Sequence, residues 1–159
     1  MNEFDLVRLL TERKFHICCA ESCTAGLISA SIVNVPDASA VLEQGYITYS
    51  DGAKISLLGV NPDTIEKYGV VSRETAAEMA AGAADAAGCE TAISATGYAG
   101  PSGGDSFAER GTVCFGFCIN KKVETAEVFW PELSRNELRL KAAQFAIDHM
   151  CRLLITQEQ

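Results

Sequence analysis

Small hydroxyl-bearing residues and glycine interrupt an apolar pattern near the start of the chain, in the segment Glu21-Ser22-Cys23-Thr24-Ala25-Gly26. The run before it, residues 15–20, is typical of a strand, and residues 27–32 have helical spacing. A strand-to-helix junction brings free backbone N–H groups beside reactive side chains, so it can hold a phosphate or stabilise an oxyanion next to a nucleophile. The same pattern also fits an ordinary turn in which Ser22 or Thr24 caps the helix. Ser22 is therefore a candidate nucleophile, with a structural turn as the alternative.

A serine becomes a nucleophile only when a base removes its proton. Of the two histidines, His16 is expected in a strand that runs into the core and His149 deep in the last helix, so both are interpreted as structural. Lysine can act as the base when burial lowers its pKa. Lys54 falls about one turn into an expected helix, directly after a strand that ends at Tyr49. A serine–lysine pair with a tyrosine proton relay is the economical hypothesis, and a solvated helix lysine is the alternative.

A second unusual stretch, Thr96–Gly104, holds four glycines and one proline. Glycines let the backbone approach a ligand closely, and successive N–H groups can form an anion nest. The stretch follows a strand expected over 91–95, so in an open α/β sheet it shares a crevice with the Ser22 segment. It is neither a P-loop nor a dinucleotide fingerprint, because the Lys-Ser/Thr and the following helix are missing. Ligand binding and a flexible approach to the next hairpin both remain open.

Composition sets the broad class of the protein. The 159 residues are 48% apolar and 21% charged, which predicts one globular domain over residues 1–159. A net charge of −8 gives no electrostatic case for nucleic-acid binding. No apolar run approaches the roughly 20 residues of a membrane span, and the acidic start is unlike a signal peptide, so a cytoplasmic protein with no membrane partner is expected.

The seven cysteines are odd in number and several lie in apolar runs, which predicts reduced, buried thiols. The pair Cys114 and Cys118 lies on an expected strand, where four residues span roughly 13 Å. Two thiolates so far apart cannot share one zinc ion at about 2.3 Å each. No metal site is predicted.

Caps, turn residues and apolar spacing predict the order of elements. Helices are expected over residues 3–13, from the Glu21–Gly26 segment to about 33, and over 50–59, 64–68, 72–87 and 135–155. Strands are expected over 15–20, 45–49, 91–95, 111–119 and 123–130. One or two helical turns are expected over 38–44. The small side chains of residues 76–84 predict a neighbouring element packed very close. The order predicts an α/β fold, a three-layer α/β/α sandwich whose mixed, mostly parallel sheet includes an antiparallel hairpin.

Five motifs occur together and in order: Glu21–Gly26, Thr48-Tyr49-Ser50-x-x-x-Lys54, Gly69–Ser72, Ala95–Gly104 and Gly111-Thr112-Val113. In these the chain resembles the CinA C-terminal domain family, the nicotinamide-nucleotide amidohydrolases also known as PncC. The resemblance covers nearly the whole chain. Larger relatives carry an extra N-terminal domain for which this chain is too short, so a stand-alone form is expected.

The resemblance implies hydrolytic deamidation of nicotinamide mononucleotide to nicotinate mononucleotide and ammonia, a small-molecule reaction without cofactor or metal. It implies Ser22 as nucleophile, Lys54 as base and Tyr49 as proton relay. Together with the frequency of twofold oligomers, it also implies a homodimer. Substrate contacts are expected from Thr24, Ala25, Gly26, Thr96, Gly97, Gly100 and Arg135.

Two departures from the family pattern and two rival hypotheses accompany this interpretation. Ala25 stands where the family usually has glycine, and its methyl group is expected to narrow the supposed oxyanion site; Asp51 stands where asparagine is common. One rival is a nitrilase-like set of Cys23, Glu21 and Lys54. The other is a nucleotide-sensing or partner-binding protein that kept the pocket but is a weak or inactive enzyme.

Overall fold

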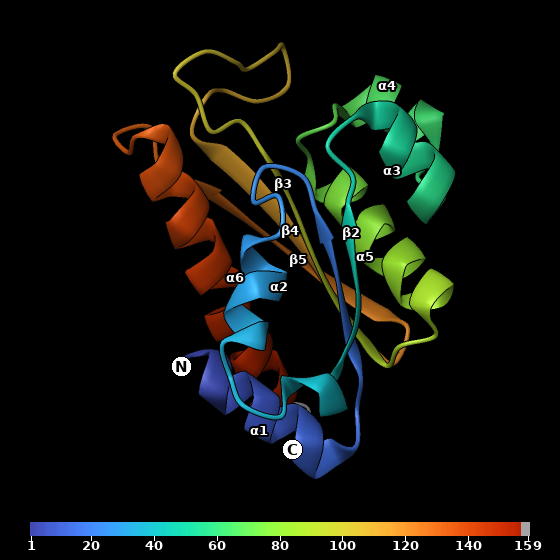
Figure 1. Ribbon diagram of the computed structural model, residues 1–159. Coiled ribbons are helices and arrows are strands. Elements are labelled where there is room, and N and C mark those ends of the chain that lie inside the picture. Colours follow the sequence, from blue (N-terminus) through green and yellow to red (C-terminus); the bar gives the residue numbers. More distant parts are fainter. Residues whose placement is uncertain (157–159) are drawn as a thin grey trace.

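A single five-stranded sheet is the centre of the computed structural model, which describes residues 1–156 (Figure 1). The strands lie in the order β2-β1-β3-β4-β5, with β1 paired in parallel to β2 and β3, and β4 antiparallel to β3 and β5. Four strands therefore run in one direction and only β4 opposes them. Their bounds are β1 Ile17–Glu21, β2 Leu42–Ile47, β3 Thr91–Gly97, β4 Thr112–Ile119 and β5 Lys122–Phe129. The expected α/β fold with a mixed, mostly parallel sheet is confirmed.

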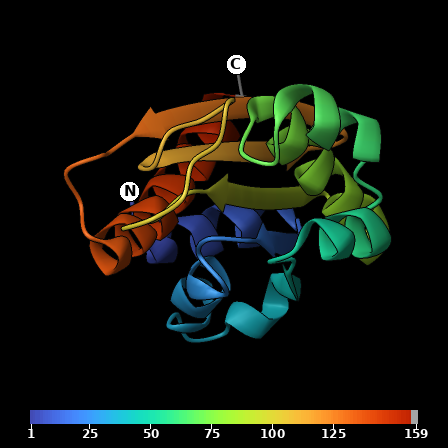
Figure 2. The ribbon, with the colours of Figure 1, turned by 90° about the horizontal axis from the view of Figure 1, so that it is seen from above.

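Helices cover both faces of this sheet (Figure 1). One face carries α1 Glu3–Arg13, α2 Leu27–Val33 and α6 Arg135–Thr156, and the other carries α3 Asp51–Leu58, α4 Pro62–Tyr68 and α5 Arg73–Ala87. A short 3-10 helix, Ala38–Ala40, precedes β2. The carboxyl ends of β1, β2 and β3 meet at the edge of the sheet opposite the chain termini. Figure 2 looks down on that edge, where the yellow loop after β3 lies over the strands.

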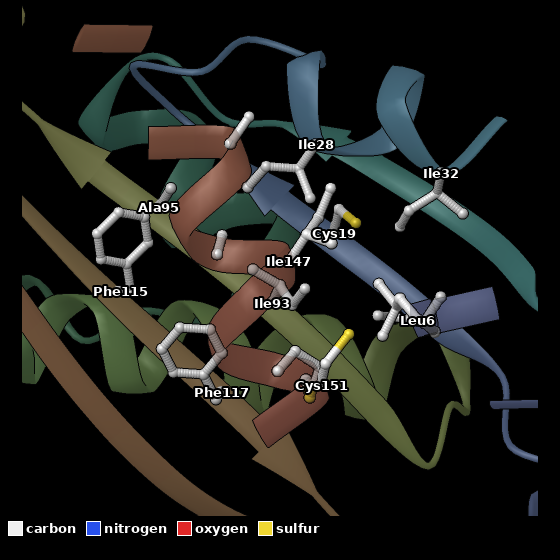
Figure 3. Packing of buried hydrophobic residues seen from close by; sticks show 14 of the residues in the cluster. Leu6, Cys19, Ile28, Ile32, Ile93, Ala95, Phe115, Phe117, Ile147 and Cys151 are labelled. Carbon is white, nitrogen blue, oxygen red and sulfur yellow. The ribbon is translucent and has the colours of Figure 1, made fainter. Parts of the chain in front are cut away.

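Burial on both faces marks β1 as a central strand, as expected from its apolar run. Alternate side chains point to opposite sides, so Cys19 joins the core beneath α1, α2 and α6, whereas Cys18 and Ala20 join the core beneath α3 and α5. Figure 3 shows Cys19 among Ile28, Ile93 and Ile147 on the α2 and α6 side. The same alternation applies to the residues that directly follow β1, so it determines the face of the sheet toward which each of their side chains projects.

The small side chains of α5 do allow a very close approach, as expected. A Cβ atom placed on Gly82 would overlap the carbonyl of Leu58 in α3, and one placed on Gly116 of β4 would overlap the carbonyl of Ala76 in α5. Helix α5 therefore packs almost backbone to backbone against both neighbours. This contact holds α3 firmly against α5 and the sheet.

Several expected boundaries were wrong. β1 begins at Ile17, so His16 precedes the strand and lies half-exposed, 3.5 Å from Glu90. β2 begins at Leu42 and occupies the second half of the expected helical turns, because an edge strand with exposed side chains lacks a clear alternation. The turn between β4 and β5 is the pair Asn120-Lys121, both at positive φ (48° and 68°), which suits a two-residue hairpin.

His149 is structural, as expected, with its ring packed against Phe117 and Phe145. All seven cysteines are free, and all except the half-buried Cys89 are buried. Within residues 1–156, no helix combines the length and apolar character needed to cross a membrane.

Candidate active site

Ser22 and Lys54 meet at the carboxyl edge of the parallel strands. The N–H of Ser22 donates to the carbonyl of Ala95 at 2.9 Å, which extends the pairing of β1 with β3 by one residue. Ser22 therefore projects to the same side as Ala20, toward α3. Lys54 lies in the first turn of α3, whose start is capped by Ser50 through a 3.1 Å bond from the N–H of Ala53. The Nζ of Lys54 is 3.0 Å from the Oγ of Ser22, and the two residues are only 1% and 7% exposed.

Two backbone carbonyls complete the surroundings of the Lys54 amine, that of Thr48 at 2.8 Å and that of Tyr49 at 3.4 Å. No carboxylate of the described residues forms an ion pair with it. Burial lowers the pKa of Lys54, and the charge of Asp51 opposes this only in part. As an ammonium, Nζ donates to Ser22 Oγ and to both carbonyls; once neutral, it keeps two N–H groups for the carbonyls and its lone pair can accept the Ser22 proton. The alternative of a solvated helix lysine is wrong.

The carboxylate of Glu21 occupies the start of α2. It accepts the N–H groups of Gly26 and Ile28 at 3.0 Å each, and both the N–H and the hydroxyl of Ser29 at 2.9 and 2.8 Å. The N-cap residue is Gly26, at φ 98°, with no side-chain cap of its own. Neither Ser22 nor Thr24 caps the helix, and the helix start offers no vacant amide because Glu21 has filled it.

Unpaired amides lie earlier in the same turn. Within residues 1–156, the N–H groups of Cys23 and Thr24 donate to no oxygen, and the Cys23 amide interacts only with its own thiol, whereas the N–H of Ala25 donates to the carbonyl of Ser22 at 3.1 Å. Ala25 itself sits at φ 46°, a left-handed conformation that strains any residue with a Cβ. Two adjacent free donors directly after a buried serine have the arrangement of an oxyanion hole.

Two buried hydroxyls close in sequence to Ser22 and to Tyr49 have no hydrogen-bond partner. The Oγ1 atoms of Thr24 and Thr48 are the only fully enclosed side-chain oxygens in the described part of the chain that make no hydrogen bond. Buried polar groups are nearly always bonded, so these two hydroxyls are exceptions to the rule. Thr24 was expected to contact substrate, whereas Thr48 was named only as part of a motif.

Arg135, at the start of α6, contacts two other segments that were predicted to belong to the site. Its guanidinium donates to the carbonyl of Gly100 at 2.8 Å and to the hydroxyl of Tyr49 at 3.2 Å. Tyr49 is 61% exposed, and only its carbonyl, not its hydroxyl, contacts Lys54. Arg135 therefore links the Gly100 loop to the Tyr49 side chain, whose backbone carbonyl contacts Lys54.

Thr96 and Gly97 belong to the end of β3 rather than to the loop. The hydroxyl of Thr96 donates to the carbonyl of Val70 at 3.0 Å, tying β3 to the segment before α5. A Cβ on Gly97 would lie 2.8 Å from the carbonyl of Thr112, so only glycine fits there. The Thr96 side chain and the absence of one at Gly97 thus serve packing at the end of β3.

Comparison with known proteins identifies the family to which the chain belongs. The sequence profile of the CinA C-terminal domain matches residues 2–154. The nicotinamide-nucleotide amidohydrolase PncC of Enterobacter agglomerans is 42% identical over 147 residues, which make up 92% of this chain and 89% of that protein. The chain belongs to the CinA C-terminal domain family. The resemblance drawn from the five motifs is confirmed.

Other members of the family are similar to the chain in sequence and in structure. A CinA-like protein of Kosmotoga olearia is 43% identical over 152 residues, 94% of this chain and 36% of that protein. The chain spans only 30% to 37% of the length of seven such curated relatives. The crystal structure of a competence or damage-inducible protein from Enterobacter asburiae superposes with a TM-score of 0.92 at 34% identity, covering 96% of this chain and 95% of that one.

The nitrilase-like set finds no support in this member of the CinA family. Burial raises the pKa of the Cys23 thiol to about 12, so it stays protonated at neutral pH. Glu21 already accepts four hydrogen bonds from the start of α2, and the Lys54 amine contacts Ser22. The geometry favours serine as the nucleophile.

One residue that contacts the Ser22 segment was not among those expected from the sequence. Arg139, one turn beyond Arg135 in α6, donates from Nε to the carbonyl of Cys23 at 2.9 Å and from a terminal nitrogen to that of Thr24 at 3.4 Å. Nothing in the sequence distinguishes Arg139 from the other charged residues of α6, because its partners lie more than a hundred residues away.

Proposed function

We propose that this chain hydrolyses the carboxamide of nicotinamide mononucleotide, with Ser22 as nucleophile and Lys54 as general base. The observation that carries the proposal is the 3.0 Å contact between a buried hydroxyl and a buried amine that has no carboxylate partner among the described residues. The 42% identity to a nicotinamide-nucleotide amidohydrolase supports the choice of substrate.

In the first half-reaction, neutral Lys54 takes the proton of Ser22 while Oγ bonds to the carboxamide carbon. The electron pair of the carbonyl moves to its oxygen, and the N–H groups of Cys23 and Thr24 stabilise the resulting oxyanion. Collapse of the tetrahedral intermediate breaks the C–N bond. The leaving nitrogen takes the proton from Lys54 and departs as ammonia, leaving an ester on Ser22.

In the second half-reaction, Lys54 takes a proton from water, whose oxygen bonds to the ester carbon. The new intermediate collapses, the bond to Ser22 breaks, and Oγ regains its proton from Lys54. The product acid then ionises to nicotinate mononucleotide. Tyr49 is proposed as a relay for the proton that goes to ammonia, which requires its exposed hydroxyl to turn from Arg135 toward the leaving nitrogen.

The pyridinium ring of this substrate is positively charged, and a cation near Lys54 disfavours the protonated amine. Substrate binding therefore keeps the base in its active form. Arg135 and the backbone around Gly100 are proposed to hold the phosphate, with Thr24, Ala25, Gly26, Thr96 and Gly97 forming the walls around the carboxamide. A homodimer and a cytoplasmic location remain predictions.

Ser22→Ala tests the nucleophile. The variant loses one oxygen and should fold, while ammonia release falls about a thousandfold or more. Cys23→Ala is the matched control next to it and should retain turnover. Turnover of Ser22→Ala within tenfold of the parent would transfer the role to another residue.

A nucleotide sensor is the second candidate, favoured by the strained Ala25 at φ 46° in the turn that forms the oxyanion site. Measuring both binding and ammonia release distinguishes the sensor from the enzyme. Binding of nicotinamide mononucleotide by calorimetry without ammonia release would identify the sensor, and release of one ammonia per nucleotide consumed would identify the enzyme.

A further inference from the structure

The guanidinium of Arg139 contacts the backbone directly behind the proposed oxyanion site. It reaches the carbonyls of Cys23 and Thr24 from α6, which lies beside α2 (Figure 1). Its remaining contact is a 3.4 Å bond to the side chain of Asn136, and no carboxylate of the described residues pairs with it. The positive charge is therefore directed at two peptide groups.

Each peptide group joins the carbonyl of one residue to the N–H of the next. The carbonyl of Cys23 shares its peptide with the N–H of Thr24, which is one of the two free donors. Arg139 thus bonds one end of that peptide while the other end faces the site.

The contact of Arg139 with the Thr24 carbonyl is connected to the Cys23 N–H through one further hydrogen bond. The carbonyl of Thr24 shares its peptide with the N–H of Ala25, which donates to the carbonyl of Ser22 at 3.1 Å. That carbonyl in turn shares its peptide with the N–H of Cys23. Both free amides therefore end hydrogen-bonded chains of peptides that begin at one arginine.

Hydrogen-bonded chains polarise one another, and the effect is larger where water is excluded. A cation on the carbonyl oxygen draws electrons through the peptide and makes its N–H a stronger donor. Donors that are fixed before the reaction stabilise developing charge without reorganisation. The loop is fixed from its other side as well, because the Glu21 carboxylate holds the amides of Gly26, Ile28 and Ser29.

We propose that Arg139 is a positioning residue that orients and polarises the peptides of Cys23 and Thr24 to form the oxyanion hole. The catalytic role given to Arg139 rests on the proposed deamidation, whereas the contacts from which it is inferred belong to the free protein. Arginine suits the role because its planar fork serves two carbonyls at once, whereas lysine offers a single nitrogen.

The kinetic test compares Arg139→Gln with the matched variant Arg135→Gln, one turn away on the same helix. Arg139→Gln should lower kcat by about tenfold to a hundredfold, less than the 10²–10³-fold for outright loss of a donor, with KM for nicotinamide mononucleotide unchanged within about twofold. Arg135→Gln should chiefly raise KM. An unchanged kcat in Arg139→Gln would overturn the inference.

Amide proton shifts provide a readout that does not depend on turnover. In ¹H–¹⁵N spectra of the free protein, Arg139→Gln should move the amide protons of Cys23, Thr24 and Ala25 upfield, by more than any other amide outside α6, while Arg135→Gln leaves them in place. If the parent releases no ammonia, the proposed function fails and these shifts alone decide the role of Arg139. Unmoved shifts would refute it.

Arg139→Lys covers the case in which the glutamine variant does not fold. It keeps the charge but has one nitrogen, so only one of the two amides should retain its parent shift. Retention of both shifts and of full kcat would show that the two-carbonyl contact has no part in forming the site.

Discussion

The Oγ of Ser22 and the Nζ of Lys54 lie 3.0 Å apart, although 32 residues separate them in the chain. Two features produce this contact. Ser22 continues the alternation of β1 and so projects toward α3, and α5 holds α3 tightly because Gly82 lets the Leu58 carbonyl come close. The lysine reaches the serine with its whole side chain buried, which is why its amine can be a base.

The first prediction concerns the pH dependence of deamidation. Because burial lowers the pKa of Lys54, the neutral base becomes available at a lower pH than for an ordinary lysine, which titrates near pH 10.4. We expect kcat/KM for nicotinamide mononucleotide to rise about tenfold per pH unit and to level off at the lowered pKa. Lys54→Arg should be inactive over the whole range, since arginine stays charged. Substantial activity in Lys54→Arg would make Lys54 a binding group instead.

The second prediction concerns stability and applies even to an inactive protein. Between the lowered pKa of folded Lys54 and the unfolded value of about 10.4, the unfolded chain binds more protons, so the stability contributed at this site rises with pH. We expect the melting temperature of the parent to increase relative to Lys54→Met as pH is raised from about 7 to about 10. Lys67→Met, which removes an exposed lysine, is the matched control and should show no such trend.

Local signals in the sequence specified much of this fold. Ser50 and Gly59 bracket α3, and Ser72 and Gly88 bracket α5, where they were expected. Such caps depend on neighbouring residues, so they can be read directly from the chain. The pairing of Ser22 with Lys54 was also within reach, because strand ends in a parallel sheet share one edge.

What the sequence could not provide are contacts that depend on tertiary placement. Glu21 was read as part of the motif segment and as the acid of the nitrilase-like set, yet it ends β1 and its carboxylate caps α2, which starts at Leu27. Arg139 binds carbonyls more than a hundred residues away, and backbone carbonyls leave no mark in the sequence. His16 was assigned to the core on apolar neighbours alone, although it precedes the strand.

The third prediction concerns the phosphate of the substrate. In a chain of net charge −8, binding an anion depends on local donors, and Arg135, an exposed cation bonded to the Gly100 carbonyl, is the donor proposed for the phosphate. Charge-assisted hydrogen bonds contribute roughly 1.5–3 kcal/mol each, so losing two should lower kcat/KM about a hundredfold or more. We expect nicotinamide riboside to be that much poorer than the mononucleotide.

Arg135→Met should remove most of this preference for the mononucleotide while barely changing turnover of the riboside. Both compounds can be compared in one ammonia-release assay. Equal efficiency of the parent on both would contradict the phosphate role of Arg135.

The last prediction concerns Ala25, which holds φ at 46° in the turn that carries the two free amides. A Cβ in the left-handed region costs roughly 1–2 kcal/mol, and glycine costs about 0.5–1 kcal/mol through the greater freedom of the unfolded chain. Ala25→Gly should therefore stabilise the protein by up to about 1 kcal/mol, which corresponds to a rise in Tm of about 2–4 °C.

Ala30→Gly is the matched control for this change, because it also replaces alanine by glycine on the exposed surface of the neighbouring helix α2. There the backbone is helical, so glycine should destabilise by about 1 kcal/mol. Opposite signs for the two variants, measured by thermal melts, would attribute the effect to the backbone conformation of Ala25. If the methyl group also narrows the oxyanion site, Ala25→Gly should increase kcat while Ala30→Gly leaves it unchanged. A stabilised Ala25→Gly with unaltered kcat would mean that the methyl group strains the turn without obstructing the carboxamide.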